Sequence, residues 1–319
     1  MENERGVYFS EYMRDKQVKV FTLIGLKPPV NNWENGAKPY QEFFYETMDF
    51  KIPVKYNSIG LRGELPTLKK DSTEFRIVTL GDSFMEGFGA GEDSTFPKLL
   101  QAKLDNTVKK VTIINGGKCG SNPMFETTLY KNVLKKWNAD LVIMEVNICD
   151  IAEFEIASNQ GKMPIKEYFL AISHIYRILD NGLLMKNMIL QNTSKSNAKK
   201  RTVEINKMMQ HLNAFQQDLL KNNTHFLVVY LPLLPEINTT RYHYVFSDAL
   251  KDSLSNSKMP FVDLTPDYKK IIPDNSKKIY EYYYYNDHHH TPKGYNMMAE
   301  IVAENLKATS LKENSIKIY

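Results

Sequence analysis

The sequence has few cysteines, no long apolar run and little net charge. Two cysteines among 319 residues, Cys119 and Cys149, exclude a fold built on a disulfide framework. No stretch of about 18 consecutive apolar residues is present, which argues against a membrane-spanning segment. The net charge of +4 comes from 41 basic and 37 acidic residues, and no basic stripe is interleaved with aromatic residues. We therefore expect no nucleic-acid partner.

The first residues also lack the apolar core of a signal peptide. The opening segment, MENERGVYFSEYMRDK (1–16), is polar and charged. A chain whose leader or anchor had been removed would begin in the same way. We expect an extracytoplasmic location, either periplasmic or membrane-anchored with the leader removed, and leave a cytoplasmic location open.

Five short apolar runs, separated by segments long enough for helices, dominate the chain from residue 75 onward. Continuous apolar runs of this length are typical of parallel strands that are covered on both faces. The runs are FRIVTL (75–80), VTIING (111–116), LVIMEVN (141–147), HFLVVYLPLL (225–234) and MPFVDLT (259–265). They predict a three-layer α/β/α sandwich with a mostly parallel, flavodoxin-like sheet.

Three regions outside these runs complete the predicted organisation. Apolar residues at helical spacing predict helices over 94–104, over 124–137 and from Pro292 onward. Residues 1–70 are rich in aromatics, Pro and Asn and predict an irregular N-terminal arm packed on a main domain of 71–319. The long connection of about 151–224 predicts a helical insertion, which is either a lid over the site or an ordinary pair of packing helices.

The segment LGDSFMEG (80–87) places a serine, Ser83, just after the first predicted strand. Ligands bind at this carboxyl edge of an open parallel sheet. Backbone N–H groups at the start of a helix stabilise negative charge there. Ser83 is therefore a candidate nucleophile, although a serine in this place would also serve as a helix N-cap.

The segment DHHHTPKG (287–294) offers the base that a serine nucleophile needs. A histidine removes the hydroxyl proton, and a carboxylate fixes its tautomer and stabilises the imidazolium. Asp287 and His289 are two residues apart, close enough for a turn to bring them together. A surface histidine cluster or a metal site is the alternative. Three consecutive histidines do not easily converge on one ion, and we expect neither a metal nor another cofactor.

Taken together, the motifs resemble the SGNH (GDSL-type) hydrolase family, in particular bacterial polysaccharide-modifying members with a D-x-H last block. GDSF (81–84) is similar to the nucleophile block, which implies Ser83 as nucleophile and its backbone N–H as an oxyanion donor. NGGKCG (115–120) is similar to the N-x-G-x-x-G block, which implies the N–H of Gly117 as the second donor. DHH (287–289), followed by TPKG, is similar to the D-x-H block and implies the Asp-His pair described above.

One block departs from the family pattern. Members usually end the third strand in G-x-N-D, whose Asn side chain is the third oxyanion donor. Here the segment reads VNICD (146–150), so ungapped alignment puts Cys149 at the Asn position and Asn147 at the Gly position. A thiol is a weak donor. Either Asn147 reaches the oxyanion hole through a locally shifted backbone, or Cys149 is left at the position of the third donor and the site is slow or even inactive.

The resemblance implies a serine-dependent hydrolysis or transfer of a small acyl group through an acyl-enzyme. We expect acetyl as the acyl group and a polysaccharide or small-molecule ester as the substrate. Water as the second nucleophile gives an esterase, and a sugar hydroxyl gives a transferase. Two alternatives stay open: a non-catalytic binding or assembly module, suggested by VNICD, and a lipase or thioesterase, suggested by the apolar helical pattern over 165–184.

Overall fold

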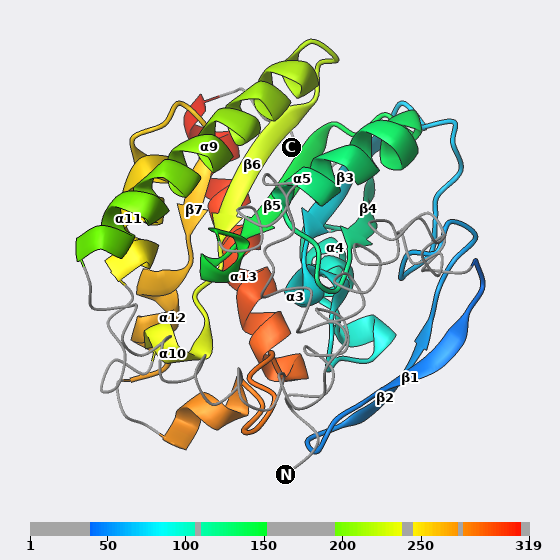
Figure 1. The fold of residues 1–319 in the computed structure, drawn as a ribbon. Coiled ribbons are helices and arrows are strands. Elements are labelled where there is room, and N and C mark those ends of the chain that lie inside the picture. Colours follow the sequence, from blue (N-terminus) through cyan, green and yellow to red (C-terminus); the bar gives the residue numbers. More distant parts are fainter. Residues whose placement is uncertain (1–38, 106–109, 152–194, 238–244, 274–276, 314–319) are drawn as a thin grey trace, which may run out of the picture.

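The computed structural model describes residues 39–105, 110–151, 195–237, 245–273 and 277–313. Five parallel strands form one sheet in the order β4-β3-β5-β6-β7 (Figure 1). The strands are β3 (Glu74–Gly81), β4 (Lys110–Gly117), β5 (Leu141–Val146), β6 (His225–Tyr230) and β7 (Phe261–Asp263). The earliest of them, β3, lies between the next two, which is the flavodoxin-like order. The predicted parallel sheet is confirmed.

Helices cover both faces of this sheet. One face packs against α4 (Phe96–Leu104), α10 (Leu234–Ile237), α12 (Thr265–Ile271) and α13 (Pro292–Glu313). The other face packs against α5 (Pro123–Leu129), α9 (Lys195–Leu220) and α11 (Val245–Ser255). Alternate strand residues enter the two cores: Ile77 faces the first and Val78 the second. Burial on both faces explains the continuous apolar runs in the sequence.

Two predicted elements end earlier than their apolar patterns do. The run 225–234 forms a strand only as far as Tyr230, and Pro232 follows shortly after. The predicted helix 124–137 is regular only in α5, continues as a π turn (Tyr130–Leu134) and closes as a 3₁₀ turn (Lys135–Trp137). Asn138, with a φ of 50°, ends that turn in the left-handed conformation.

The prediction of an irregular arm is wrong for part of residues 39–70. An antiparallel hairpin of β1 (Glu42–Glu46) and β2 (Lys51–Lys55) lies outside the main sheet. Its alternation of half-buried and exposed residues extends over only five positions in each strand. Pro53 within β2 also argues against a strand in the sequence, because proline within sheets is found mainly in edge strands.

The predicted insertion of about 151–224 is only partly described. Residues 152–194, which include the apolar helical pattern over 165–184, lie outside the described residues. The remainder forms α9, whose Ile205, Met208 and Leu212 are buried in the core. This helix is therefore a packing helix of the sandwich.

Among the helices of the described ranges, none is both long enough and apolar enough to cross a membrane.

Candidate active site

Ser83 lies at the carboxyl end of the central strand β3, on the first residue of a single helical turn, α3 (Ser83–Glu86). The chain turns sharply at Gly81, whose φ is 153° and where a Cβ would lie 2.7 Å from Oε2 of Glu145. A side chain at residue 81 would therefore not fit. Asp82 is the N-cap, since its Oδ1 accepts the N–H of Phe84 at 2.8 Å. The capping role considered for Ser83 thus belongs to its neighbour.

The structure brings the three residues expected to carry the chemistry into contact. Oγ of Ser83 lies 2.7 Å from Nε2 of His289, and Nδ1 of that ring lies 2.5 Å from Oδ1 of Asp287. The side chains of Asp287 and His289 are 8% and 2% exposed. Serine, imidazole and carboxylate therefore form a continuous chain of hydrogen bonds, which is the geometry that activates a hydroxyl for attack. We refer to these residues as the candidate triad.

A tight turn explains the spacing of two between the carboxylate and the imidazole. His288 adopts a left-handed backbone conformation, with a φ of 68°, and its side chain is exposed. Oδ1 of Asp287 accepts the backbone N–H of His289 at 3.3 Å as well as facing its ring. The carboxylate therefore fixes both the backbone and the side chain of the histidine.

The third histidine of the run has a different environment. His290 is buried among the rings of Phe84, Tyr268, Tyr283 and Tyr295. Burial lowers the pKa of His290 to about 3, so the ring is neutral at ordinary pH. One histidine of the run is exposed, one belongs to the candidate triad and one is in the core. The three side chains do not converge, as a shared metal ion would require.

Gly117 does not offer the N–H expected of it. Its N–H already donates to Oδ1 of Asn115 at 2.9 Å. A Cβ at residue 117 would lie 2.2 Å from the backbone N of Glu86, so this glycine allows β4 to pack closely against α3. The prediction of Gly117 as an oxyanion donor is therefore corrected: its role is packing.

Another backbone N–H in the same loop, that of Gly120, is not engaged in this way. The loop rests on the carbonyl of Gly81, which accepts the Lys118 N–H and the Ser121 hydroxyl, each at 3.0 Å. Between these contacts, Gly120 is exposed and has a φ of 70°. Within the described part of the chain, no acceptor bonds the N–H of Gly120 or of Ser83. The sequence block NGGKCG contains both Gly117 and Gly120. The sequence does not show which of the two N–H groups is available, whereas the hydrogen bond from Gly117 to Asn115 does.

Asn147 is also committed elsewhere. Its Nδ2 donates to Oδ2 of Asp82 at 3.0 Å and to Oε1 of Glu145 at 2.9 Å, and the side chain is fully buried. Both amide hydrogens are therefore used, and the expected role as oxyanion donor is replaced by that of holding the residue before Ser83. Cys149 lies in the following helical turn, and its side chain is exposed.

Because the side chain of Cys149 is exposed, we expect that a carboxamide at residue 149 would not restore a third donor. We expect Cys149→Asn to change kcat/KM by less than about threefold, far below the hundred- to thousandfold effect of one oxyanion donor. Steady-state kinetics on one acetyl ester measure this. A gain of tenfold or more would show that residue 149 does reach the oxyanion.

A buried carboxyl, Glu145, lies beneath the turn that carries Ser83. Burial raises its pKa well above the ordinary value, and the nearby carboxylates of Asp82 and Asp150 raise it further. Oε2 of Glu145 accepts the Asp82 N–H at 3.4 Å, and Oε1 accepts from Asn147. This carboxyl, whose raised pKa favours the protonated form, thus supports the same turn that Asn147 holds.

The raised pKa predicts a pH-dependent effect of Glu145→Gln on stability. An unfolded glutamate loses its proton near pH 4.5, whereas the folded one keeps it to higher pH. The unfolded state then binds fewer protons, so this group's contribution falls as pH rises above that value. Glutamine has no proton to lose, and the free energy of unfolding of the variant, relative to wild type, should increase from pH 5 to pH 8. Urea unfolding at both pH values tests this, and an unchanged difference would contradict it.

A second buried carboxylate, Glu86, joins three segments around the site. Its Oε1 accepts the hydroxyls of Tyr56 at 2.6 Å and of Tyr45 at 2.8 Å, and Oε2 accepts the Cys119 N–H at 2.5 Å. Burial by itself would raise the pKa of Glu86, but the charge of Lys118 and these hydrogen bonds lower it overall. The anion therefore ties the hairpin to α3 and to the glycine loop. No motif in the sequence indicates this role.

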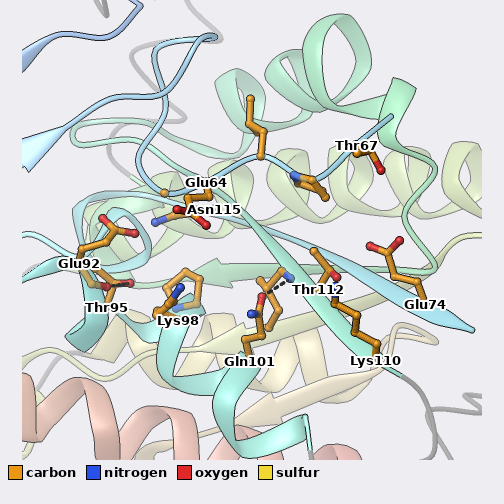
Figure 2. A pocket seen from close by; sticks show the side chains of 15 residues that line it. Glu64, Thr67, Glu74, Glu92, Thr95, Lys98, Gln101, Lys110, Thr112 and Asn115 are labelled. Atoms are coloured by element: carbon orange, nitrogen blue, oxygen red, sulfur yellow. Dashed lines mark hydrogen bonds between the residues drawn. The ribbon is translucent and has the colours of Figure 1, made fainter. Parts of the chain in front are cut away.

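A cavity of about 320 Å³ lies elsewhere, along β4 and α4 (Figure 2). Its lining includes Glu64, Glu92, Lys98, Gln101 and Asn115. No member of the candidate triad lines it. The cavity is therefore separate from the chemistry described above.

Comparison with known proteins gives the following similarities. No family model matches the chain. An uncharacterized protein of Mycoplasma pneumoniae is 24% identical over 165 residues, which make up 51% of this chain and 18% of that protein. The match thus spans less than a fifth of that relative's length.

Several solved structures are also similar. A lipase/acylhydrolase from Enterococcus faecalis is 13% identical, with 74% of this chain and 96% of that chain covered and a TM-score of 0.45. A protein from Desulfitobacterium hafniense assigned to the G-D-S-L lipolytic family is 14% identical, with 72% and 98% covered and a TM-score of 0.43. A two-domain esterase active on acetylated mannans is 14% identical, with 76% and 51% covered and a TM-score of 0.44. The candidate triad of this chain rests on the hydrogen bonds within its own structure and not on these similarities.

Proposed function

We propose that this chain is a serine-dependent ester hydrolase or acyltransferase of the SGNH type. The observation that carries the proposal is the hydrogen-bonded chain from Ser83 through His289 to Asp287 at the carboxyl end of a parallel sheet. Ligands bind at that edge in open α/β folds. The order of the motif blocks along the sequence supports the same conclusion.

The contacts suggest how each residue acts. Oγ of Ser83 attacks the ester carbonyl while Nε2 of His289 takes its proton, and Asp287 stabilises the imidazolium. The proton then passes to the departing alcohol, which leaves an acyl-serine. Water or an acceptor hydroxyl attacks this ester next, with the same imidazole as base. The carbonyl oxygen carries negative charge in each step, and the N–H groups of Ser83 and Gly120 are the donors we assign to it.

The acyl group and its carrier are a finer part of the proposal. We infer a small acyl group, with acetyl the favoured one, on a carbohydrate or similar ester. The sequence resemblance to polysaccharide-modifying members with a D-x-H block supports this. An exposed aromatic pair also supports it, because aromatic faces suit sugar rings. The rings of Tyr280 and Tyr285 lie 4.7 Å apart, and Tyr285 stands two residues before Asp287 in the chain.

A panel of esters tests the proposal. Nitrophenyl esters of acetate, butyrate, octanoate and palmitate are compared with an acetylated polysaccharide, and a fluorophosphonate probe is used to label the serine. The proposal expects turnover of the acetate ester and covalent labelling of Ser83, located by peptide mass spectrometry. A preference for palmitate would favour a lipase or thioesterase. No turnover and no labelling would favour a non-catalytic module.

A further inference from the structure

We propose that Asp49, in the turn of the β1–β2 hairpin, is the positioning residue for Asp287. This inference rests on the proposed function and extends it to a segment outside the α/β sandwich. Figure 1 shows the hairpin in blue as a ribbon separate from the five-stranded sheet.

Asp49 holds the backbone of Asp287 directly. Its Oδ2 accepts the backbone N–H of Asn286 at 2.9 Å and of Asp287 at 2.8 Å. Its Oδ1 accepts the side-chain amide of Asn286 at 2.9 Å. Three donors on one carboxylate form charge-assisted hydrogen bonds, which are stronger than those between neutral groups. The residue that orients His289 is therefore itself oriented by the hairpin.

The turn containing Asp49 is fixed in its own right. The Thr47 N–H donates to the Phe50 carbonyl at 2.9 Å, and the Thr47 hydroxyl accepts the Asp49 N–H at 3.1 Å. Phe50 is buried, and its ring packs against Tyr284 at a centroid distance of 4.7 Å. The carboxylate is thus presented from a turn that its own hydrogen bonds and the packing of Phe50 hold in place.

The loop that carries Asp287 needs this support. Its internal bonds run from the Tyr284 N–H to the His289 carbonyl at 2.8 Å and from the His288 N–H to the Tyr284 carbonyl at 3.2 Å. Neither bond uses the N–H of Asn286 or of Asp287. Asp49 is the acceptor for both, so its loss would leave the middle of the loop without an anchor.

The same hairpin also holds the other half of the candidate triad. Tyr45 of β1 donates to Glu86 on the helical turn that begins with Ser83. The ring of Phe50 also packs against Phe88, just beyond that turn, at 5.2 Å. Ser83 and His289 are 206 positions apart in the sequence, and the hairpin contacts the segments of both. A clamp of this kind holds the serine and the imidazole at a fixed separation.

Kinetics of three hairpin variants test the role of Asp49. Asp49→Ala should lower kcat for the acetate ester by about ten- to hundredfold with KM little changed, since a displacement of about 1 Å in a catalytic group costs that much. Asp49→Asn should recover most of the rate, because its carbonyl oxygen still accepts the two backbone N–H groups. Glu42→Ala, the matched control, removes an exposed carboxylate that pairs with Lys55 in the same hairpin and should leave kcat unchanged.

A spectroscopic measurement separates positioning from general destabilisation. The proton between His289 and Asp287 should give a strongly downfield ¹H NMR resonance in wild type, and Asp49→Ala should shift or broaden it. Should the alanine variant fail to fold, Asn286→Ala provides a second test. It removes one of the three bonds to Asp49 and should give a smaller change in the same resonance.

A kcat of Asp49→Ala equal to that of Glu42→Ala would overturn the proposal, and so would an unchanged downfield resonance. A loss that appears only in KM would also overturn it. Failure of the proposed function looks different, because wild type would then neither turn over esters nor react with the fluorophosphonate. The resonance would still report whether Asp49 positions Asp287.

Discussion

Replacing Ser83 with alanine is expected to lower kcat/KM for a short-acyl ester by at least about 10⁴-fold, the scale seen when a nucleophile is removed from a hydrogen-bonded triad. The variant keeps the backbone N–H groups but has no oxygen to form the acyl-enzyme. Any residual turnover would come from water acting in the oxyanion hole. Initial-rate kinetics on nitrophenyl acetate, with the purified variant at high concentration, measure the loss.

The same substitution should leave the fold almost unchanged. Asp82, and not Ser83, caps the helical turn, so the variant loses one side-chain hydrogen bond and no cap. The free energy of unfolding should change by no more than about 1 kcal/mol. Ser253→Ala is the control, since it removes a serine hydroxyl bonded to the Ala249 carbonyl in α11, away from the site. Turnover by Ser83→Ala at the wild-type rate would exclude this serine as the nucleophile.

The sheet could be predicted from the sequence because its signal is local and strong. Strands buried on both faces are continuous apolar runs, and each of the five expected runs coincides at least in part with a strand of the sheet. The hairpin is not predictable in this way because its pattern is short and contains Pro53. Its stability depends on distant partners, such as the Glu86 carboxylate that accepts Tyr45. No window of the sequence around residues 42–55 contains that information.

The candidate site divides in the same way. Ser83, Asp287 and His289 stand in compact motifs whose chemistry is visible in the residue types. The oxyanion donors are backbone N–H groups, and whether such a group is available depends on its own hydrogen bond in the fold. Gly117 and Asn115 stand two residues apart in the same motif. Only the structure shows that the Asn115 side chain accepts the Gly117 N–H, so that this N–H is already used.

The amide of Asn147 illustrates the limit of motif alignment. The sequence alone left open whether residue 147 or residue 149 completes the oxyanion hole. The answer depends on Asp82 and Glu145, two carboxyls that meet only when β3 and β5 pair. Their acceptor atoms take both amide hydrogens. A positional alignment cannot detect such competition between acceptors, whereas the packed structure makes it explicit.

Replacing Asp287 with asparagine is expected to lower kcat by about 10⁴-fold, as a wrong histidine tautomer does in serine hydrolases. The Asp287 carboxylate accepts from Nδ1 of His289, which leaves Nε2 unprotonated and able to take the proton of Ser83. An amide N–H in its place would donate to Nδ1 and move the ring proton to Nε2. The imidazole would then present a donor to the serine hydroxyl and could not act as its base.

This account makes asparagine at least as damaging as alanine at residue 287, although asparagine keeps the size of the side chain. Asp287→Ala removes the anchor but does not impose the wrong tautomer, so its kcat should equal or exceed that of Asp287→Asn. Asp252→Asn, an exposed position on α11, is the matched control and should have wild-type kinetics. The downfield proton of the His289–Asp287 pair should vanish in both residue 287 variants. Retention of more than about a tenth of the wild-type kcat by Asp287→Asn would mean that other groups fix the tautomer, because the orienting carboxylate would then contribute far less than in a serine triad.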